Sequence, residues 1–305
     1  MVKMRRSSAP APRAFRLFVA VVAALSASLP AAAQSVEREM FVSVLNQADE
    51  PVLTLGAPDF IVREDGRTRE VLRARRATDA IDLVLLVDTS QALGDQVNDV
   101  RKALEGFIAR MRPQAQIAIV GVGDRPTIYS DYTNSPEQLA RGVGRIFPIV
   151  GAGAYFLDAV AEVVKGLSTR KADRAAIVAI WAGGVEFGTE SYENLAKGLK
   201  ARGVSFHAIA IGNRAPRDSG TTEGRNRERL FASGTTETGG RRENPLNSMA
   251  LAGALDRLAS ELLGQYRITF ARPDTLIPPE KTEVAVRPDG LKARGILIAA
   301  PKTAK

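Results

Sequence analysis

Residues 81–88 read IDLVLLVD, an almost unbroken apolar run that ends in an aspartate. A strand that is buried on both faces carries apolar side chains at nearly every position, so this run predicts a central strand of a covered sheet. Residues 95–111 follow, with their apolar side chains on one helical face. A buried strand that leads into an amphipathic helix indicates a parallel sheet covered by helices.

The same alternation continues over about 79–264. Ser135 and Pro136 mark one helix start, since serine is a favoured cap and proline a favoured first residue. Further buried strands are predicted at 117–123, 175–184 and 204–212, and further helices at 136–146, 156–167, 192–203 and 248–264. We therefore expect an α/β fold with a doubly wound, mostly parallel sheet over 79–264.

The segments on either side of this region, 34–78 and 265–305, alternate apolar and polar residues between turn signals. This pattern is typical of short strands. Neither segment holds enough strands to bury a face alone. We expect the N-terminal and C-terminal segments to pair in space as a small β module.

Residues 213–247 interrupt the strand and helix rhythm. They are polar and hold seven arginines, with glutamates interleaved among them. We expect a long surface excursion with a short helix near 227–232. A solvated face is the simpler interpretation of the arginines, and a site for a polyanion is the alternative.

The first 33 residues have the three-part pattern of a secretory signal peptide. A basic start precedes the apolar run 17–29, and small residues at Ala31 and Ala33 predict cleavage after Ala33. An uncleaved anchor is the alternative, although a membrane span needs about 20 residues. We therefore expect a periplasmic or secreted protein with no membrane span after cleavage.

The composition excludes several functions. The formal charge is +8, but without the first 33 residues 37 basic residues face 34 acidic ones, so nucleic acid is not an expected partner. The absence of cysteine excludes disulfides and thiolate chemistry. His207, the single histidine, alternates with apolar neighbours in a predicted strand. No catalytic or nucleotide-binding motif accompanies it, and we expect a protein that is not an enzyme.

Residues 84–93, VLLVDTSQAL, lie where the first buried strand ends, which is the usual ligand crevice of such sheets. Here the chain resembles a von Willebrand factor type A (VWA) domain, whose first strand ends in Asp-x-Ser-x-Ser. The whole chain is similar to the bacterial exported "VWFA-related" proteins. That resemblance rests on PDFIVREDGRTREV (58–71), GAGAYFLDAV (151–160), AIVAIWAGG (176–184) and ELLGQYRITF (261–270).

The resemblance implies a metal-ion-dependent adhesion site at this crevice, and the sequence departs from it. The family supplies an aspartate and two serines from the first loop, a threonine from the second and an aspartate from the third. Asp88 and Ser90 match the first two of these ligands, whereas Ala92, Ala154 and Ala182 replace the other three. Magnesium requires hard oxygen ligands, which methyl groups cannot supply.

We therefore expect a vestigial site that binds no metal and no other cofactor. Magnesium bound with help from Asp95, Asp158 or Glu186 is the alternative. Asp88 is instead expected to accept backbone N–H bonds and to cap the next helix.

The expected function is that of a non-catalytic, extracytoplasmic protein-binding or assembly module that works without metal. Its partner is unidentified, and the loops expected to bind it are 89–95, 151–157 and 182–191, with the arginine-rich segment 213–247 as a further candidate. The expected contacts are Gln91, Tyr155, Trp181 and Glu186; Trp181 either anchors the partner or fills the space of the missing ligands. Two alternatives stay open: a metal-dependent adhesion domain with a rearranged site, and a small-molecule-binding or enzymatic crevice, which would need a deep polar pocket.

Overall fold

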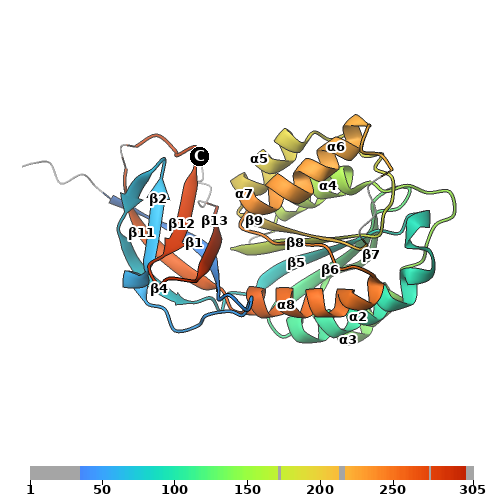
Figure 1. The fold of residues 1–305 in the computed structure, drawn as a ribbon, viewed down its shortest axis with the longest axis horizontal. Helices are drawn as coiled ribbons and strands as arrows, with labels where there is room; N and C mark the ends of the chain where they lie inside the picture. The colour runs from blue at the N-terminus through green and yellow to red at the C-terminus, as the bar shows by residue number, and fades with distance from the viewer. Residues whose placement is uncertain (1–34, 171–172, 213–216, 275, 300–305) are drawn as a thin grey trace, which may run out of the picture.

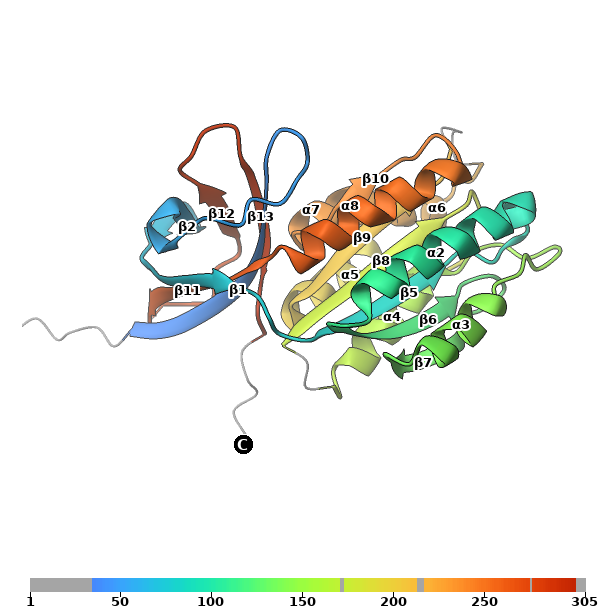
Figure 2. The ribbon, with the colours of Figure 1, turned by 90° about the horizontal axis from the view of Figure 1, so that it is seen from below.

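The computed structural model describes residues 35–170, 173–212, 217–274 and 276–299. The signal peptide expected at 1–33 lies outside these residues. The described chain forms two parts, a layered α/β unit and a smaller β module beside it (Figures 1 and 2). Among the described residues no helix combines the length and the apolar character that crossing a membrane requires.

A six-stranded sheet forms the middle layer of the α/β unit. Its order is β10-β9-β8-β5-β6-β7, and β6–β7 is the one antiparallel pair among its described strands. Every residue of the central strand β5 is buried, as the apolar run predicts. The expected mostly parallel sheet is therefore confirmed. The strands are β5 (Ile81–Val87), β6 (Ala115–Gly121), β7 (Thr127–Thr133), β8 (Arg174–Trp181), β9 (Val204–Ala210) and β10 (Arg242–Glu243).

Helices cover both faces of this sheet (Figure 1). One face packs against α2 (Val97–Met111), α3 (Pro136–Gly144) and α8 (Leu251–Leu263). The other face packs against α4 (Phe156–Leu167), α5 (Tyr192–Arg202) and the π-helical turn η3 (Leu230–Gly234), which follows α6 (Thr222–Arg229). The remaining short helices are η1 (Ala57–Asp59), η2 (Gln91–Gln96), α7 (Thr235–Glu237) and η4 (Ser248–Ala250).

The expected surface excursion at 213–247 is corrected by the structure. In its described part, 217–247, Phe231 packs on the sheet face together with Phe156 and Phe206. Arg227, expected on a solvated face, is fully buried. The reason is that η3, which directly follows α6, buries Leu230 and Phe231 against the sheet. This holds α6 close to the sheet face, where Arg227 pairs with Asp218.

The β module joins the two ends of the chain, as the flanking strand patterns predict. Strand β1 (Ser35–Leu45) pairs antiparallel with β11 (Tyr266–Pro273) and with β13 (Lys292–Leu297). Tyr266 anchors the core, since its ring meets Phe60 edge-on at 5.2 Å and its hydroxyl donates to the Val52 carbonyl at 2.9 Å. The other strands are β4 (Val71–Arg76), β2 (Phe60–Glu64), β3 (Arg67–Arg69) and β12 (Thr282–Val286).

A buried ionic cluster joins the β module to the α/β unit. The Glu261 carboxylate of α8 accepts two bonds of 2.7 Å from Arg294 of β13 and one of 3.2 Å from Arg241. Arg241 also pairs with Asp49 of the β module at 2.5 Å. The β module lies beside the amino ends of the parallel strands (Figure 1), so their carboxyl ends face away from it.

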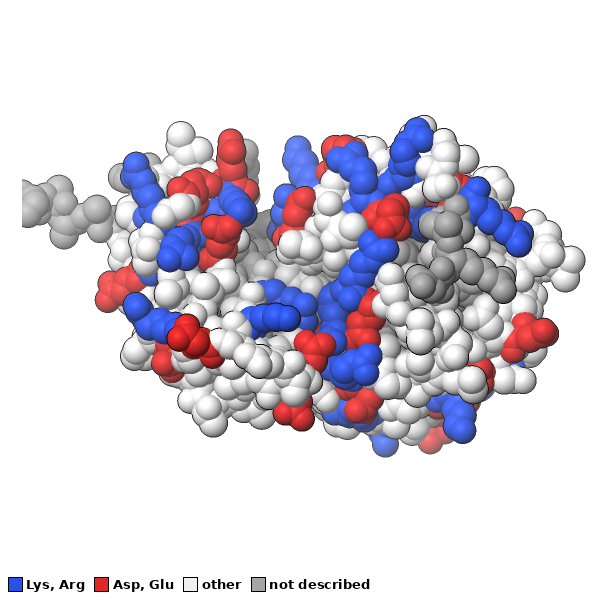
Figure 3. All heavy atoms as spheres, in the orientation of Figure 1, with Lys and Arg blue, Asp and Glu red and all other residues white. Residues whose placement is uncertain are grey.

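The visible surface mixes both signs of charge. In Figure 3 basic and acidic side chains are interspersed over the α/β unit and the β module. This agrees with the near-balance of charges outside the first 33 residues.

The substitution Glu261→Gln tests the ionic cluster. It removes a buried charge that two arginines share, and we expect the free energy of unfolding to fall by about 1.5–3 kcal/mol in urea titrations. Asp256→Asn on the same helix is the control, since Asp256 pairs with Arg110 at the exposed surface. That control should cost under about 1 kcal/mol. Equal losses in both variants would contradict a special role for the cluster.

Candidate functional site

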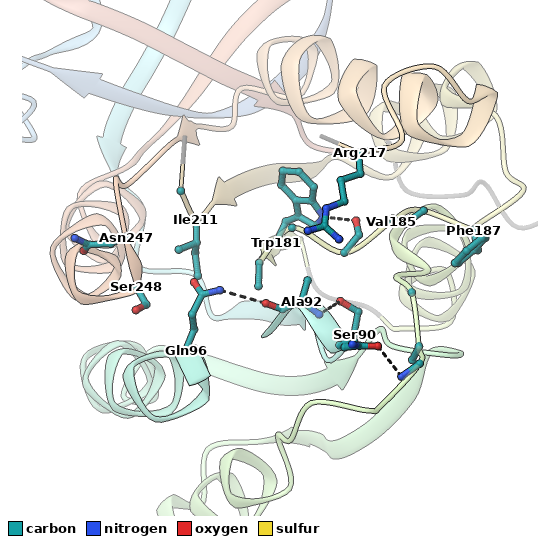
Figure 4. A pocket seen from close by; sticks show the side chains of 18 of the residues that line it. Ser90, Ala92, Gln96, Trp181, Val185, Phe187, Ile211, Arg217, Asn247 and Ser248 are labelled. Carbon is teal, nitrogen blue, oxygen red and sulfur yellow. Dashed lines mark hydrogen bonds between the residues drawn. The ribbon is translucent and has the colours of Figure 1, made fainter. Parts of the chain in front are cut away.

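A pocket of about 870 Å³ opens at the carboxyl edge of the six-stranded sheet (Figure 4). Parts of the three predicted loops line it. Ile211 and Gly212 after β9, Arg217, and residues 246–248 before α8 also line it. Of these, Arg217, Leu246 and Asn247 belong to the arginine-rich segment 213–247. The lining residues are Ser90, Gln91, Ala92, Gln96, Gly151, Ala152, Gly153, Trp181, Ala182, Gly183, Gly184, Val185, Phe187, Ile211, Gly212, Arg217, Leu246, Asn247 and Ser248.

The Asp88 carboxylate connects the first and third loops behind the pocket. Its Oδ1 accepts the Ser90 N–H at 2.9 Å, and its Oδ2 accepts the N–H groups of Ala182 at 2.9 Å and Gly184 at 3.1 Å. The side chain is buried, so these bonds replace the water that a carboxylate would otherwise need. Asp88 thus accepts backbone amides, as expected, but it does not cap the next helix, because Ser90 is the N-cap of η2.

Ser90 and Gly184 fill the space next to Asp88. The Ser90 Oγ accepts the Ala92 N–H at 3.2 Å and so caps the short helix η2. A Cβ atom at Gly184 would lie 2.5 Å from the Ser90 Oγ and 3.0 Å from the Asp88 Oδ2. The third loop therefore approaches the first at backbone distance, and this approach requires glycine.

The three alanines lie in apolar or backbone surroundings. Ala154 is fully buried in the core below the pocket, and its backbone bridges Gly123 and Glu186. Ala182 joins the core on the opposite face of the sheet. Ala92 lines the pocket beside Ser90. Each therefore presents a methyl group where the resemblance implies a ligand oxygen.

A further carboxylate near this edge, Asp158, also accepts backbone amides. Asp158 takes the N–H groups of Thr189 at 2.8 Å and Glu190 at 3.3 Å. Asp95 is exposed on η2. Within the described ranges no three His, Cys, Asp or Glu residues gather as a set that could hold a metal ion.

Glu186 was expected to contact a partner, but its side chain is buried and holds the backbone together instead. Its carboxylate is buried at the start of α4 and accepts the N–H groups of Phe156 and Leu157 at 3.3 Å and Gly188 at 3.0 Å. Burial raises the pKa of Glu186 to about 7, although the Leu157 and Gly188 N–H groups oppose the shift. The carboxylate turns inward because the first N–H groups of a helix have no partner within the helix and attract a negative charge.

Trp181 faces inward and is only 7% exposed. Its Nε1 donates to the Gly184 carbonyl at 2.8 Å, and the Arg227 guanidinium lies 4.3 Å from the centre of its ring system. Arg227 in turn pairs with Asp218, which accepts the Glu186 N–H at 2.7 Å. Sequence analysis missed this Asp218–Arg227 pair, because no motif or period marks it.

Gln91 and Tyr155 lie at the rim of the site, near the surface. The exposed Gln91 accepts the Gly151 N–H at 3.0 Å through its side chain, so it joins the first and second loops. The half-buried Tyr155 ring lies 6.1 Å from that of Phe187. Their contact with a partner stays a prediction.

Large apolar side chains lie in, or close in the chain to, the segments that line the pocket, and they are open to solvent. Val150 is 90% exposed, Leu246 76% and Met249 74%. We define the apolar rim as these three residues together with Phe147, Ile149 and Phe187, which are also exposed. Phe187 and Leu246 also line the pocket, whose other described residues are mostly glycine, alanine and neutral polar residues.

Comparison with known proteins identifies similar domains. The model of the von Willebrand factor type A domain matches residues 82–238. A structure of proximal thread matrix protein 1 from the mussel byssus, with a zinc-occupied MIDAS motif, is 13% identical, with a TM-score of 0.50 over 66% of this chain and 49% of that one. The chain thus spans about half the length of the mussel protein.

A bacterial domain gives a similar result. The vWF domain of the type V pili tip protein Mfa5 from Porphyromonas gingivalis is 14% identical, with a TM-score of 0.49 over 61% of this chain and 96% of that domain. No curated protein matches the sequence. At these identities, the likeness to solved structures concerns the fold alone.

The substitution Glu186→Gln tests the buried carboxylate. Because the pKa of Glu186 is raised in the folded state, its contribution to stability is fully present below about pH 4.5 and is lost as the pH rises through about 7. Relative to the glutamine variant, the wild type should lose up to about 3 kcal/mol of unfolding free energy between pH 5 and 8. Urea titrations at several pH values measure this difference.

Glu162→Gln is the matched control, since Glu162 lies on the exposed face of α4, the helix whose first N–H groups Glu186 accepts. Parallel stability curves for the wild type and Glu186→Gln across this pH range would contradict the assignment.

Proposed function

The chain belongs to the von Willebrand factor type A domain family, and on that premise we propose that it is a non-catalytic module that binds a protein partner at the carboxyl edge of its six-stranded sheet. Domains of this family are generally interaction or adhesion modules. The observation that carries the proposal is the apolar rim around the pocket.

The apolar rim is the kind of surface that a partner covers. Three of its side chains, Val150, Leu246 and Met249, are each more than 70% exposed. Clustered apolar side chains in water are unfavourable, and on a folded protein such patches mark interaction surfaces. The loops below are held by hydrogen bonds that Asp88, Glu186 and Asp158 accept from backbone N–H groups, so the rim is displayed on a firm base.

Binding at this surface does not use a metal ion. Magnesium prefers six oxygen ligands, whereas both oxygens of Asp88 already accept backbone amides and the Ser90 Oγ accepts another. The close backbone of Gly184 occupies the space beside these atoms. Glu186 and Asp158, two of the three carboxylates considered for a rebuilt site, accept backbone N–H groups of their own, and the third, Asp95, is exposed on η2. The donor set therefore does not fit magnesium.

The pocket lining also supports a role without catalysis. Of the described lining residues, Arg217 alone is charged, and no histidine or carboxylate is among them. His207 is buried in β9, where its Nδ1 accepts the Arg241 N–H at 3.1 Å. Burial lowers the pKa of His207 to about 4, so the ring is neutral at physiological pH. No general acid or base therefore faces the crevice from these residues.

Export is part of the proposal and rests on the sequence of the first 33 residues. Their basic start, apolar run and small residues match a secretory signal. The module would then act in the periplasm or outside the cell, where a chain without cysteine depends on packing alone.

A small-molecule ligand is the second candidate, and the pocket itself favours it. A volume of about 870 Å³ lies within the range of about 300–1,000 Å³ that is typical of ligand sites. The edge is hollow rather than flat, so a compact ligand could enter it. The exposed apolar rim has no role in this alternative, which is why protein binding comes first.

Melting temperatures test the metal-free part of the proposal. The chain without residues 1–33 should melt at the same temperature in EDTA and in millimolar magnesium or manganese. A bound ion at 100 times its dissociation constant would add about 2.7 kcal/mol, a shift of a few degrees at this size. A shift of this size that disappears in Ser90→Ala would overturn metal independence.

Variants of the apolar rim test protein binding. A partner isolated from the extracytoplasmic fraction by affinity capture should bind Val150→Asp and Met249→Asp at least about tenfold more weakly, because each buries a charge at the interface. Ile128→Asp is the control, since Ile128 is also exposed but lies on the edge strand β7. Unchanged affinity in both rim variants, measured by calorimetry, would contradict this surface as the binding site.

A further inference from the structure

We propose that the pocket receives an acidic side chain of the partner, which forms a direct ion pair with Arg217. The inference rests on the proposed function and specifies the chemistry of the partner. Arg217 lies on the segment after β9, and its side chain reaches into the pocket beside Trp181 and Val185 (Figure 4). It is the one charged side chain among the described lining residues.

The arginines of this segment differ in what they contact. The buried Arg227 is neutralised by Asp218, whose Oδ1 accepts its Nη2–H at 3.0 Å. Among the described residues no carboxylate forms an ion pair with Arg217, which is exposed. The guanidinium fork of Arg217 is therefore available to a ligand, and its geometry matches a carboxylate through two parallel hydrogen bonds.

The nearby carboxylates do not offset the charge of Arg217 inside the pocket. Asp88 is buried behind the Gly184 backbone and accepts three amides, and Glu186 lies inward at the start of α4. Neither is part of the lining. Among the described lining residues the pocket thus offers one positive charge on a wall of uncharged residues, and an anionic group is the ligand that this arrangement favours.

The apolar rim indicates how the acidic residue is presented. Phe187 lies at one side of the pocket, and Asn247 and Ser248 lie at the other (Figure 4). The exposed Leu246 and Met249 flank Asn247 and Ser248 in the chain. A segment that crosses the pocket therefore meets apolar surface on both sides of Arg217. We infer an internal Asp or Glu with apolar neighbours before and after it, rather than a chain end.

Selection from a random peptide library tests this specificity. The probe is phage-displayed peptide, and the target is the chain without residues 1–33. The selected peptides should share an acidic residue between apolar ones. Synthetic versions should bind Arg217→Gln at least about tenfold more weakly by fluorescence polarisation, because a charge-assisted pair is lost. Arg217→Glu should reverse the selection towards Lys or Arg.

Arg225→Gln is the matched control. Arg225 is an exposed arginine of the same segment, and its Nη1 donates to the Gly220 carbonyl at 2.7 Å. Its removal should change affinity by less than about twofold. Equal melting temperatures of the three variants would show that folding is intact.

The outcomes separate the inference from the proposed function. Peptides that lose affinity with Val150→Asp but share no acidic residue, or that bind Arg217→Gln as well as wild type, overturn the ion pair and leave the surface in place. Peptides that prefer a terminal carboxylate, shown by loss of binding on amidation, overturn the internal acidic residue. Peptides that bind both Val150→Asp and Arg217→Gln as well as wild type, or a library that yields no binder, overturn both proposals.

Discussion

The carboxylate of Asp88 is the constraint on which the carboxyl edge of the sheet depends. A charge that is buried to this degree is unfavourable unless hydrogen bonds replace its water, and three backbone N–H groups do so here. Two of those groups belong to the loop after β8, so this loop must approach the loop after β5. The approach requires glycine at 184, since any side chain there would meet Ser90. One buried side chain thus shapes the wall of the pocket.

Other carboxylates near the pocket also accept backbone N–H groups and so connect its loops. Glu186 and Asp158 join the third loop to α4, and Asp218 holds the Glu186 N–H from a third segment. Arg227 then connects Asp218 to the indole of Trp181. In the proposed function these contacts have a purpose. Loops that are ordered before binding lose less conformational entropy in the complex, which favours affinity.

The two ends of the parallel strands have different roles in this architecture. The amino ends face the β module, and Glu261 with its two arginines fixes that contact. The carboxyl ends stay open and carry Val150, Leu246 and Met249 in solvent. A doubly wound sheet places its crevice at the carboxyl ends for topological reasons, because the loops that follow the strands meet there. The β module therefore leaves the ligand edge free.

The sequence by itself determined the layered fold and the side chains that are missing at the crevice. Burial on both faces demands continuous apolar strands such as 81–88, and alternation marks strands with one face in water, so periodicity predicted the strands of both parts. The pairing of the two flanking segments followed because neither holds enough strands to bury a face alone. The alanines at 92, 154 and 182 could be read directly, because a missing oxygen is a matter of residue identity. Only the tertiary structure decided that Arg227 is buried beside Asp218, that Glu186 caps α4, and that Arg217 enters the pocket. These positions depend on contacts between segments far apart in the chain. Whether a polar side chain is buried, and which charge it pairs with, depends on its neighbours in space, and no local sequence pattern encodes those neighbours.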